Sequence, residues 1–288
     1  MKRLFLILGV LFLLIAFFAF VFLPIDPTSS KEVMFSIEKG KGSRDIARAL
    51  EQQGLIYSGP FFRLYVLTTG TSGTLQAGTY ALSPALSLFQ IAHILATGDV
   101  IKETITIIEG WDITDIASYF EKQGLFQAEE VLNYEYLEGY LFPDTYEIQP
   151  TTPLVEVFAM MQENFQKKFT KELQEQAKRQ GRTTSEIVIM ASLLERELQT
   201  YKDKQIAADV LWKRLDIGMA LQVDAASQTY EQRGLPESPI ANPGLKSITA
   251  AIYPKESPYW YYLSEKNGRT IFSKTLEEHN KAKAFYLK

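Results

Sequence analysis

The sequence contains no cysteine. Disulfides, thiol nucleophiles and thiolate metal sites are therefore excluded, and so is a bacterial lipoprotein anchor, which needs a lipidated cysteine. Histidine is almost as scarce, because only His93 and His279 occur, far apart and without ligand spacing. We expect neither a zinc site nor a Ser-His-Asp triad from such a sequence, and no motif in it calls for another metal or a cofactor.

Positive charge is not in excess either. The 288 residues carry 30 Lys and Arg against 34 Asp and Glu, a formal net charge of -4. A nucleic-acid-binding protein normally has a basic surplus that neutralises phosphates, so no nucleic-acid partner is expected. With 46% hydrophobic and 22% charged residues, the composition is that of a globular protein with one large domain or two modest ones.

A long apolar run lies at the N-terminus. Residues 4–23 contain no polar side chain, and a helix rising about 1.5 Å per residue over that length spans a hydrocarbon core of roughly 30 Å. A cleaved signal peptide is the alternative, but the run exceeds a usual h-region and no A-x-A site precedes Pro24. We therefore expect an uncleaved transmembrane anchor. Lys2 and Arg3 place residues 1–3 in the cytoplasm by the positive-inside rule, and the rest of the chain outside it.

Two segments beyond the anchor resemble each other. Residues 36–56 align without gaps onto residues 106–126, at an offset of 70 residues, with nine identical positions. Each copy predicts a short strand, a glycine turn, an amphipathic helix and a Gly-Leu stop. Residues 24–34, before the first copy, are expected to form a linker. Small strand-helix units of this kind suit the binding of a substrate or partner, and a plain α+β scaffold is the alternative.

The C-terminal half predicts a helical core followed by a hairpin. Residues 154–180 form an amphipathic pattern that predicts a long helix. Thr183, followed three residues later by Glu186, is a capping box that opens the next helix. Asn267-Gly268 predicts the turn of a final hairpin. Helices and short strands together indicate the α+β class.

The helix after the capping box carries two glutamates in the otherwise apolar run of residues 187–199. On a helical wheel Glu195 lies between Val188 and Ala191, and Glu197 also has apolar neighbours, so this helix is expected to be central. Burial disfavours the charged form of a carboxyl group, so one interpretation is a general acid with a raised pKa. The other is a structural pair of buried glutamates, and the wheel does not choose between the two. The candidate partners for such a pair are Arg196, Arg214 and Lys213.

Several motifs occur in order along the chain. They are "EGYLFPDTYEI" at 138–148, "ASLLERE" at 191–197, "VLWKRLDIGMALQVDAAS" at 210–227 and "SPIANPGLKSITAAIYP" at 238–254. With these motifs the sequence resembles the YceG/MltG-like family of endolytic murein (peptidoglycan) transglycosylases, from the anchor almost to the C-terminus. The resemblance implies a small LysM-like α/β binding lobe at 35–135 that contains the internal repeat. It also implies a mixed α+β catalytic domain with a central helix at 136–288.

The resemblance further implies a membrane-anchored lytic transglycosylase, a lyase that cleaves MurNAc-GlcNAc β-1,4 bonds in nascent glycan strands and limits their length. The muramic C6 hydroxyl would attack its own C1 and leave a 1,6-anhydro end, so one glutamate can serve as acid and then as base without a metal or cofactor. By motif position Glu195 is the implied catalytic acid and Glu197 a supporting residue. The implied substrate-binding residues are Glu138, Gln222, Asp224 and Asn242.

The implied partners are peptidoglycan glycan strands, the membrane, and peptidoglycan synthases of the elongation or division machinery. The implied location is the bacterial cytoplasmic (inner) membrane, with a single pass and the catalytic domain on the extracytoplasmic or periplasmic side. Two alternatives remain open. A muramidase-type hydrolase would use Glu195 with Asp224, because hydrolysis needs a second carboxylate. A non-catalytic cell-wall binding or scaffold protein would be indicated by loss of the acid position, and Glu195 is present.

Overall fold

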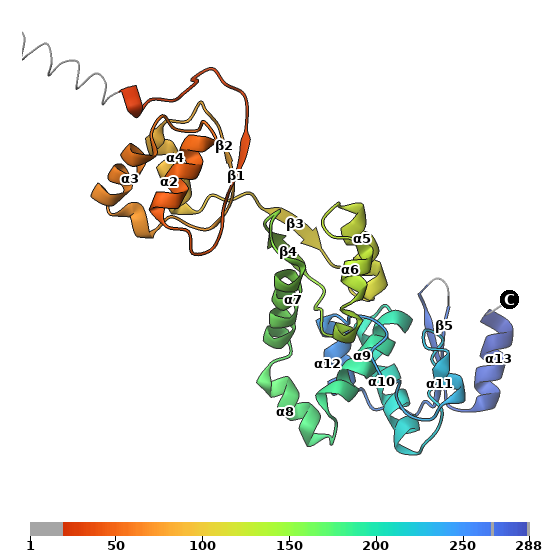
Figure 1. The fold of residues 1–288 in the computed structure, drawn as a ribbon. Helices are drawn as coiled ribbons and strands as arrows, with labels where there is room; N and C mark the ends of the chain where they lie inside the picture. The colour runs from red at the N-terminus through yellow and green to blue at the C-terminus, as the bar shows by residue number, and fades with distance from the viewer. Residues whose placement is uncertain (1–19, 266–267, 287–288) are drawn as a thin grey trace, which may run out of the picture. The chain divides into compact units, whose positions relative to one another are not determined.

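The computed structural model describes residues 20–265 and 268–286 (Figure 1). It forms two compact units, each treated by itself below: unit 1 comprises the chain up to Thr104 with Glu147–Thr152, and unit 2 comprises Ile105–Tyr146 and Pro153–Lys288. Residues 4–19, which make up most of the predicted anchor, lie outside the described part. Within the described residues, no helix has the length and apolar character needed to cross a membrane.

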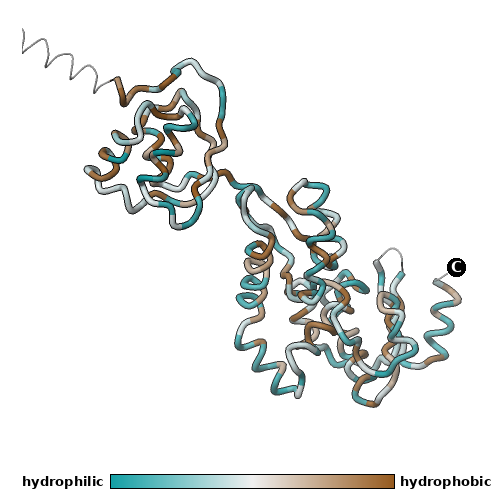
Figure 2. Tube along the Cα trace, viewed as in Figure 1, coloured by the Kyte–Doolittle hydropathy of each residue, from teal (hydrophilic) through white to brown (hydrophobic). Residues whose placement is uncertain are grey.

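Unit 1 combines one small sheet with three helices. β1 (Val33–Ile37) and β2 (Gly78–Leu82) pair antiparallel, with Val33 opposite Leu82. The helices are α2 (Ser43–Gln52), α3 (Gly59–Thr68) and α4 (Leu88–Thr97), and a 3-10 turn lies at Thr71–Gly73. Their apolar faces share one core with the sheet, centred on Phe35, Phe62 and Tyr80. Figure 2 shows the first described residues, next to the grey trace, in the brown of apolar residues.

Residues from later in the chain complete unit 1. The chain leaves and returns through a second small sheet, β3 (Glu103–Thr106) with β4 (Thr145–Ile148). After β4, Gln149 Oε1 accepts a hydrogen bond from the Thr79 amide at 3.2 Å. The hydroxyls of Thr151 and Thr79 lie 3.0 Å apart. The polar groups of β2 are therefore satisfied by a segment about 70 residues away in the sequence.

Unit 2 is mainly helical. Its helices are α5 (Ile113–Lys122), α6 (Ala128–Leu132), α7 (Leu154–Lys168), α8 (Lys171–Arg179), α9 (Thr184–Glu197), α10 (Tyr201–Asp216), α11 (Gln228–Glu231), α12 (Leu245–Ile252) and α13 (Leu276–Tyr286), with a 3-10 turn at Glu135–Leu137. β5 (Tyr261–Ser264) and β6 (Thr270–Ser273) form an antiparallel hairpin. With these helices and three two-stranded sheets in the described residues, the predicted mixed α+β class is confirmed.

Helix α9 is the centre of the unit 2 core. Its residues 187–194 are all buried, and α8, α10 and α12 pack against it. The predicted capping box is confirmed, since Thr183 accepts from the Glu186 amide while the Glu186 carboxylate accepts from the Thr183 amide at 2.7 Å. The helix ends at Glu197, because Leu198 turns to an extended conformation with φ -135°. The last turn, which carries both glutamates, therefore lies at the edge of the core.

The prediction of one long helix over residues 154–180 is wrong. The helix breaks between α7 and α8 at Phe169, where φ is -85° and ψ is 71°. The Phe169 side chain is buried, and the centroid of its ring lies 5.6 Å from the ring centroid of Phe165. Burial of this ring in the core turns the backbone out of the helix, a tertiary effect that amphipathic periodicity does not contain.

Both repeat copies form the predicted strand, turn and helix. Gly40 and Gly110 adopt φ +88° and +85° in the two turns, a conformation that glycine reaches without strain. The first copy, 36–56, lies in unit 1, and the second, 106–126, lies in unit 2. The compact units thus divide the predicted lobe of residues 35–135, and its assignment as a LysM-like binding domain stays a prediction.

Candidate functional site

Glu195, the predicted acid, lies in a buried ion pair. Its Oε1 is 2.5 Å from Nζ of Lys204 on α10, and its Oε2 accepts from the Gly244 amide at 2.9 Å. The two charged side chains are only 7% and 4% exposed. The surroundings of Glu195 are therefore not the purely apolar ones that the helical wheel indicates. Glu195 is thus one half of a buried ion pair, whose partner is Lys204 and none of the three predicted cations, and its role as the catalytic acid stays a prediction.

Glu197 lines a pocket of about 140 Å³ in unit 2. Nine other polar residues line this pocket and come from five different segments: Arg214, Gln222, Asp224, Tyr230, Tyr262, Ser264, His279, Asn280 and Lys283. Oε1 of Glu197 accepts from the Ala225 amide at 2.6 Å. Burial raises the pKa of Glu197; the Ala225 amide opposes this shift, and the negative charge of Asp224 adds to it. A carboxyl group of this kind suits proton donation to a substrate.

Asp224 is held beside Glu197 by a tyrosine. The Tyr230 hydroxyl donates a short hydrogen bond to Asp224 Oδ1. Burial, this hydrogen bond and the negative charge of Asp224 raise the pKa of Tyr230 to about 12. Tyr230 therefore keeps its proton at physiological pH and fixes the Asp224 carboxylate as an acceptor.

A buried arginine connects the walls of the pocket. Arg214 on α10 donates from Nη1 to the Leu221 carbonyl at 2.7 Å and from Nε to the Trp260 carbonyl at 2.8 Å. It thereby ties the segment before Asp224 to the start of the hairpin. Next to Leu221, Gln222 has φ +55°, the one positive φ at a non-glycine among the described residues. Backbone strain of this kind is concentrated at functional sites.

Two polar atoms in the pocket wall lack hydrogen-bond partners within the described part of the chain. They are the Tyr262 hydroxyl on β5 and Nδ1 of His279 on α13, and both atoms are buried. Burial raises the pKa of Tyr262 well above its usual value, and burial with the charge of Lys283 lowers that of His279. Tyr262 therefore remains a donor and His279 neutral near pH 7. Buried polar groups without partners in a pocket wall are suited to hydrogen bonding with a ligand.

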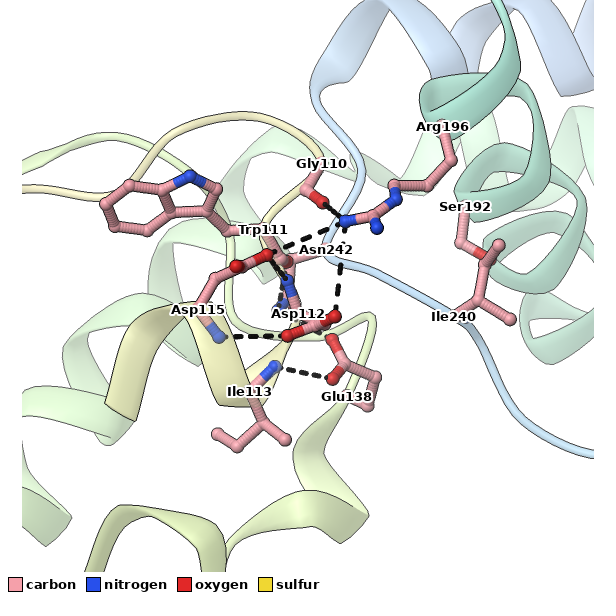
Figure 3. A network of polar contacts seen from close by, with 10 residues as sticks. All are labelled: Gly110, Trp111, Asp112, Ile113, Asp115, Glu138, Ser192, Arg196, Ile240 and Asn242. Atoms are coloured by element: carbon pink, nitrogen blue, oxygen red, sulfur yellow. Dashed lines mark hydrogen bonds and ion pairs between the residues drawn. The ribbon is translucent and has the colours of Figure 1, made fainter. Parts of the chain in front are cut away.

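Asn242 lies in a different polar network of unit 2 (Figure 3). It is fully buried, and its Oδ1 accepts from the amides of Gly139 and Leu141 at 2.9 and 3.0 Å. Its Nδ2 donates to Glu138 Oε1 at 2.8 Å and to the Trp111 carbonyl at 3.1 Å. All the hydrogen-bonding groups of this amide are used within the protein, so its role is to join three chain segments.

Glu138 belongs to the same network. Its Oε2 accepts from the Ile113 amide at the start of α5 at 2.7 Å. Burial raises the pKa of Glu138 to about 7; the Ile113 amide opposes the shift and the charge of Asp112 adds to it. Arg196 reaches this network too, since its Nη1 donates to the Gly110 carbonyl at 2.9 Å (Figure 3). The last turn of α9 thus directs three consecutive side chains to an ion pair, a structural network and a pocket.

The structure brings together half of the predicted substrate-binding residues. Gln222 and Asp224 share the pocket with Glu197, the predicted supporting residue, while Glu138 and Asn242 lie in the second network. The tyrosines and the histidine of the pocket were not among the residues predicted from the sequence. The aromatic hairpin was the available signal for Tyr262, whereas His279 had none beyond its rarity. Among the described residues, no acidic or histidine cluster could hold a metal ion.

The relatives found by comparison with known proteins agree with one another. The model of the YceG-like family matches residues 35–228 and 227–284. A Bacillus subtilis (strain 168) protein named endolytic murein transglycosylase is 31% identical, over 92% of this chain and 87% of its own length. A Streptococcus pneumoniae (strain D39) protein of the same name is 25% identical over 90% of this chain, which spans 59% of that protein.

The fold has a relative among crystal structures. A putative YceG-like protein from Listeria monocytogenes superposes with a TM-score of 0.57 at 28% sequence identity. The match covers 88% of this chain and 99% of that protein. Because the family model covers nearly all of the described sequence, this chain belongs to the YceG-like family.

Proposed function

We propose that this chain is an endolytic murein transglycosylase, a lytic transglycosylase that acts on peptidoglycan. Its relatives from Bacillus subtilis and Streptococcus pneumoniae carry that name. The observation that carries the proposal is the position of Glu197 in a polar pocket that raises its pKa. A carboxyl group whose pKa is raised above its ordinary value is suited to protonating a glycosidic oxygen.

By motif position Glu195 stays the predicted acid; because Glu197 lines the polar pocket, we propose Glu197 for this role instead. A general acid must hold a proton and release it to the leaving oxygen. Both carboxyl oxygens of Glu195 already have partners inside the protein, the Lys204 ammonium group and the Gly244 amide. Glu197 has the Ala225 amide as a neutral donor and Asp224 as a negatively charged neighbour, both of which are compatible with a protonated state.

In the proposed reaction, Glu197 donates its proton to the oxygen of the β-1,4 bond between MurNAc and GlcNAc as that bond breaks. The C6 hydroxyl of the muramic residue attacks its own C1, and the Glu197 carboxylate takes up the hydroxyl proton. No water is consumed, so the products are a free GlcNAc 4-hydroxyl and a 1,6-anhydro end. Asp224, fixed by Tyr230, supplies negative charge near the positive charge that develops on the sugar ring.

The substrate contacts proposed for this site use the unpartnered groups of the pocket wall. Sugar hydroxyls and N-acetyl groups both donate and accept hydrogen bonds, as the Tyr262 hydroxyl and the neutral His279 imidazole do. Gln222 lies in the same wall, within 3.5 Å of Arg214 Nη1. Glu138 and Asn242 act in this proposal by fixing the network that joins three chain segments of unit 2 and not by touching glycan.

The proposed location is the bacterial cytoplasmic membrane, with residues 4–23 as a single-pass anchor and both units on the extracytoplasmic side. The apolar run and the flanking Lys2 and Arg3 support it. An anchor directly before the folded chain favours nascent glycan strands as substrate, a limit on their length as the outcome, and synthases of the elongation or division machinery as neighbours. A glycan-binding role for the LysM-like lobe belongs to the same proposal.

A muramidase-type hydrolase is the second candidate, because Asp224 lies in the same pocket as Glu197 and could serve as the second carboxylate. Mass spectrometry of digested peptidoglycan separates the two candidates, since 1,6-anhydro ends support the transglycosylase and reducing ends the hydrolase. A digest without new ends would leave the scaffold alternative. Glu197→Gln should abolish cleavage while Glu195→Gln retains it below its unfolding temperature. Cleavage at the normal rate by folded Glu197→Gln would refute the assignment of the acid.

A further inference from the structure

The apolar N-terminal run meets unit 1 at a fixed point. The Phe22 carbonyl accepts from the Leu88 amide at 3.4 Å, and the Asp26 amide donates to the Pro84 carbonyl at 3.0 Å. The end of the run 4–23, at Phe22, and the predicted linker, at Asp26, are therefore each hydrogen-bonded to the segment at the start of α4.

Phe22 packs into a cluster of aromatic side chains. Its ring stacks on Phe89 of α4 at 5.0 Å between centroids, with 4° between the planes. It also meets Phe61 and Tyr65 of α3 edge-on, at 6.3 and 6.5 Å. All these rings contact Phe22, which lies one residue before the end of the apolar run. If that run crosses a bilayer, the cluster lies at the depth where aromatic side chains form belts at the lipid-water interface.

Helix α3 is apolar on its outer side as well as its inner side. Phe62 and Val66 are buried in the core, whereas Leu64 and Leu67 are 52% and 51% exposed. Arg63 is the one charged residue in the helix. A helix that is apolar all round is normally buried in protein or in lipid, and an exposed apolar patch marks an interaction surface. Figure 2 shows the apolar residues along α3 and along the segment that leads in from the N-terminus.

Three arginines border the exposed leucines. Arg44 and Arg48 of α2, with Arg63 of α3, line a hollow of about 450 Å³. Leu64 and Leu67 line the same hollow, and Glu51 is the one acidic residue in its wall. This excess of positive charge contrasts with the net charge of -4 of the chain. Guanidinium groups bind phosphate through paired hydrogen bonds, and leucines beside them suit a surface that is part apolar and part anionic.

We propose that this outer side of unit 1 rests on the lipid bilayer. The surface, called the α3 face below, consists of Phe22, Phe61, Leu64, Tyr65, Leu67 and Phe89 with the three arginines. Its apolar side chains enter the boundary between headgroups and acyl chains, and the arginines contact anionic phospholipid. The proposal rests on the proposed membrane anchor. It implies that unit 1 has two attachments to the membrane, the anchor and the α3 face, which together fix its orientation.

The absence of native cysteine permits a direct test with single labels. The full chain is reconstituted into vesicles of phosphatidylglycerol and phosphatidylethanolamine, with a fluorescent label on Leu64→Cys or Leu67→Cys and a quencher attached to the lipid acyl chains. The matched control is Met34→Cys on β1, an apolar position of similar exposure (56%) on the side of the sheet opposite to the buried Phe35. We expect at least threefold stronger quenching at the two α3 positions than at the control. Equal quenching at all three positions would overturn the proposal that the α3 face contacts the bilayer.

The arginines are tested in the Leu64→Cys background. Arg44→Gln with Arg48→Gln should reduce quenching at least twofold in vesicles that contain phosphatidylglycerol. The same change should have little effect in pure phosphatidylcholine. Equal effects in both lipids would overturn the contact with anionic headgroups.

Two further measurements separate this proposal from the two on which the experiment also depends, the membrane anchor and the transglycosylase activity. Flotation with the vesicles reports the anchor, and cleavage of soluble glycan by the same labelled proteins reports the transglycosylase. A protein that floats and cleaves but is quenched uniformly refutes the α3 face alone. A protein that does not float refutes the anchor and the α3 face together.

Discussion

Replacing Glu195 with Gln should destabilise unit 2 far more than an ordinary surface substitution. Glu195 and Lys204 are 7% and 4% exposed, so the substitution leaves an almost completely buried ammonium group without a counter-charge. Breaking a buried ion pair from one side costs about 3–5 kcal/mol. The Gln carbonyl can still accept from the Gly244 amide, which places the expected loss near the lower end, at about 3 kcal/mol.

Thermal unfolding and urea titration measure this loss. For a chain of this size about 3 kcal/mol corresponds to a fall in Tm of roughly 6–12 °C. Glu195→Gln combined with Lys204→Met removes both charges and should recover part of the loss, because no unpaired charge remains. Glu277→Gln breaks the exposed pair with Lys281 and should change the free energy of unfolding by less than about 0.5 kcal/mol. Our interpretation of Glu195 as structural is refuted if its single variant is as stable as the wild type.

Three further predictions concern the network, the pocket and a tight turn. The raised pKa of Glu138 means that the folded state binds an extra proton between pH 4.5 and about 7, so stability should fall by about 2 kcal/mol as pH rises through that window, and Glu138→Gln should flatten the profile. Tyr262→Phe and His279→Gln should raise KM for glycan about tenfold each, with smaller changes in kcat and Tm; unchanged KM would exclude them as substrate contacts. Gly139→Ala should lower stability by more than about 2 kcal/mol in urea titrations, because its φ is +86° and the added Cβ would lie 2.5 Å from Pro239.

The local structure around α9 was predictable because its signals are local. The Thr183 capping box and the continuous apolar run determine where the helix starts and that it is buried. The surroundings of the two glutamates were not predictable from the same run. Lys204, the partner of Glu195, comes from the next helix, and its approach depends on how α10 packs. Motif order therefore located the correct helical turn but not which glutamate faces the pocket.

The pocket itself required the tertiary structure. Gln222 and Asp224 follow α10 closely in the sequence and were predicted by their motif. Tyr262 and His279 come from the hairpin and the C-terminal helix, and no spacing in the sequence relates them to Glu197. Convergence of distant segments is set by packing of the whole unit, which periodicity and caps do not encode.

The discontinuity of unit 1 determines how the protein can be dissected. A chain ended after β3 would lack Gln149 and Thr151, the hydrogen-bond partners of Thr79 on β2. Such a fragment would expose polar groups of its sheet and lose its last segment, so poor folding would say nothing about its intrinsic activity. The same constraint applies to recombination between relatives. An exchange of this unit must carry residues 147–152 along with the N-terminal stretch, so the segment to be exchanged is not one continuous stretch of sequence.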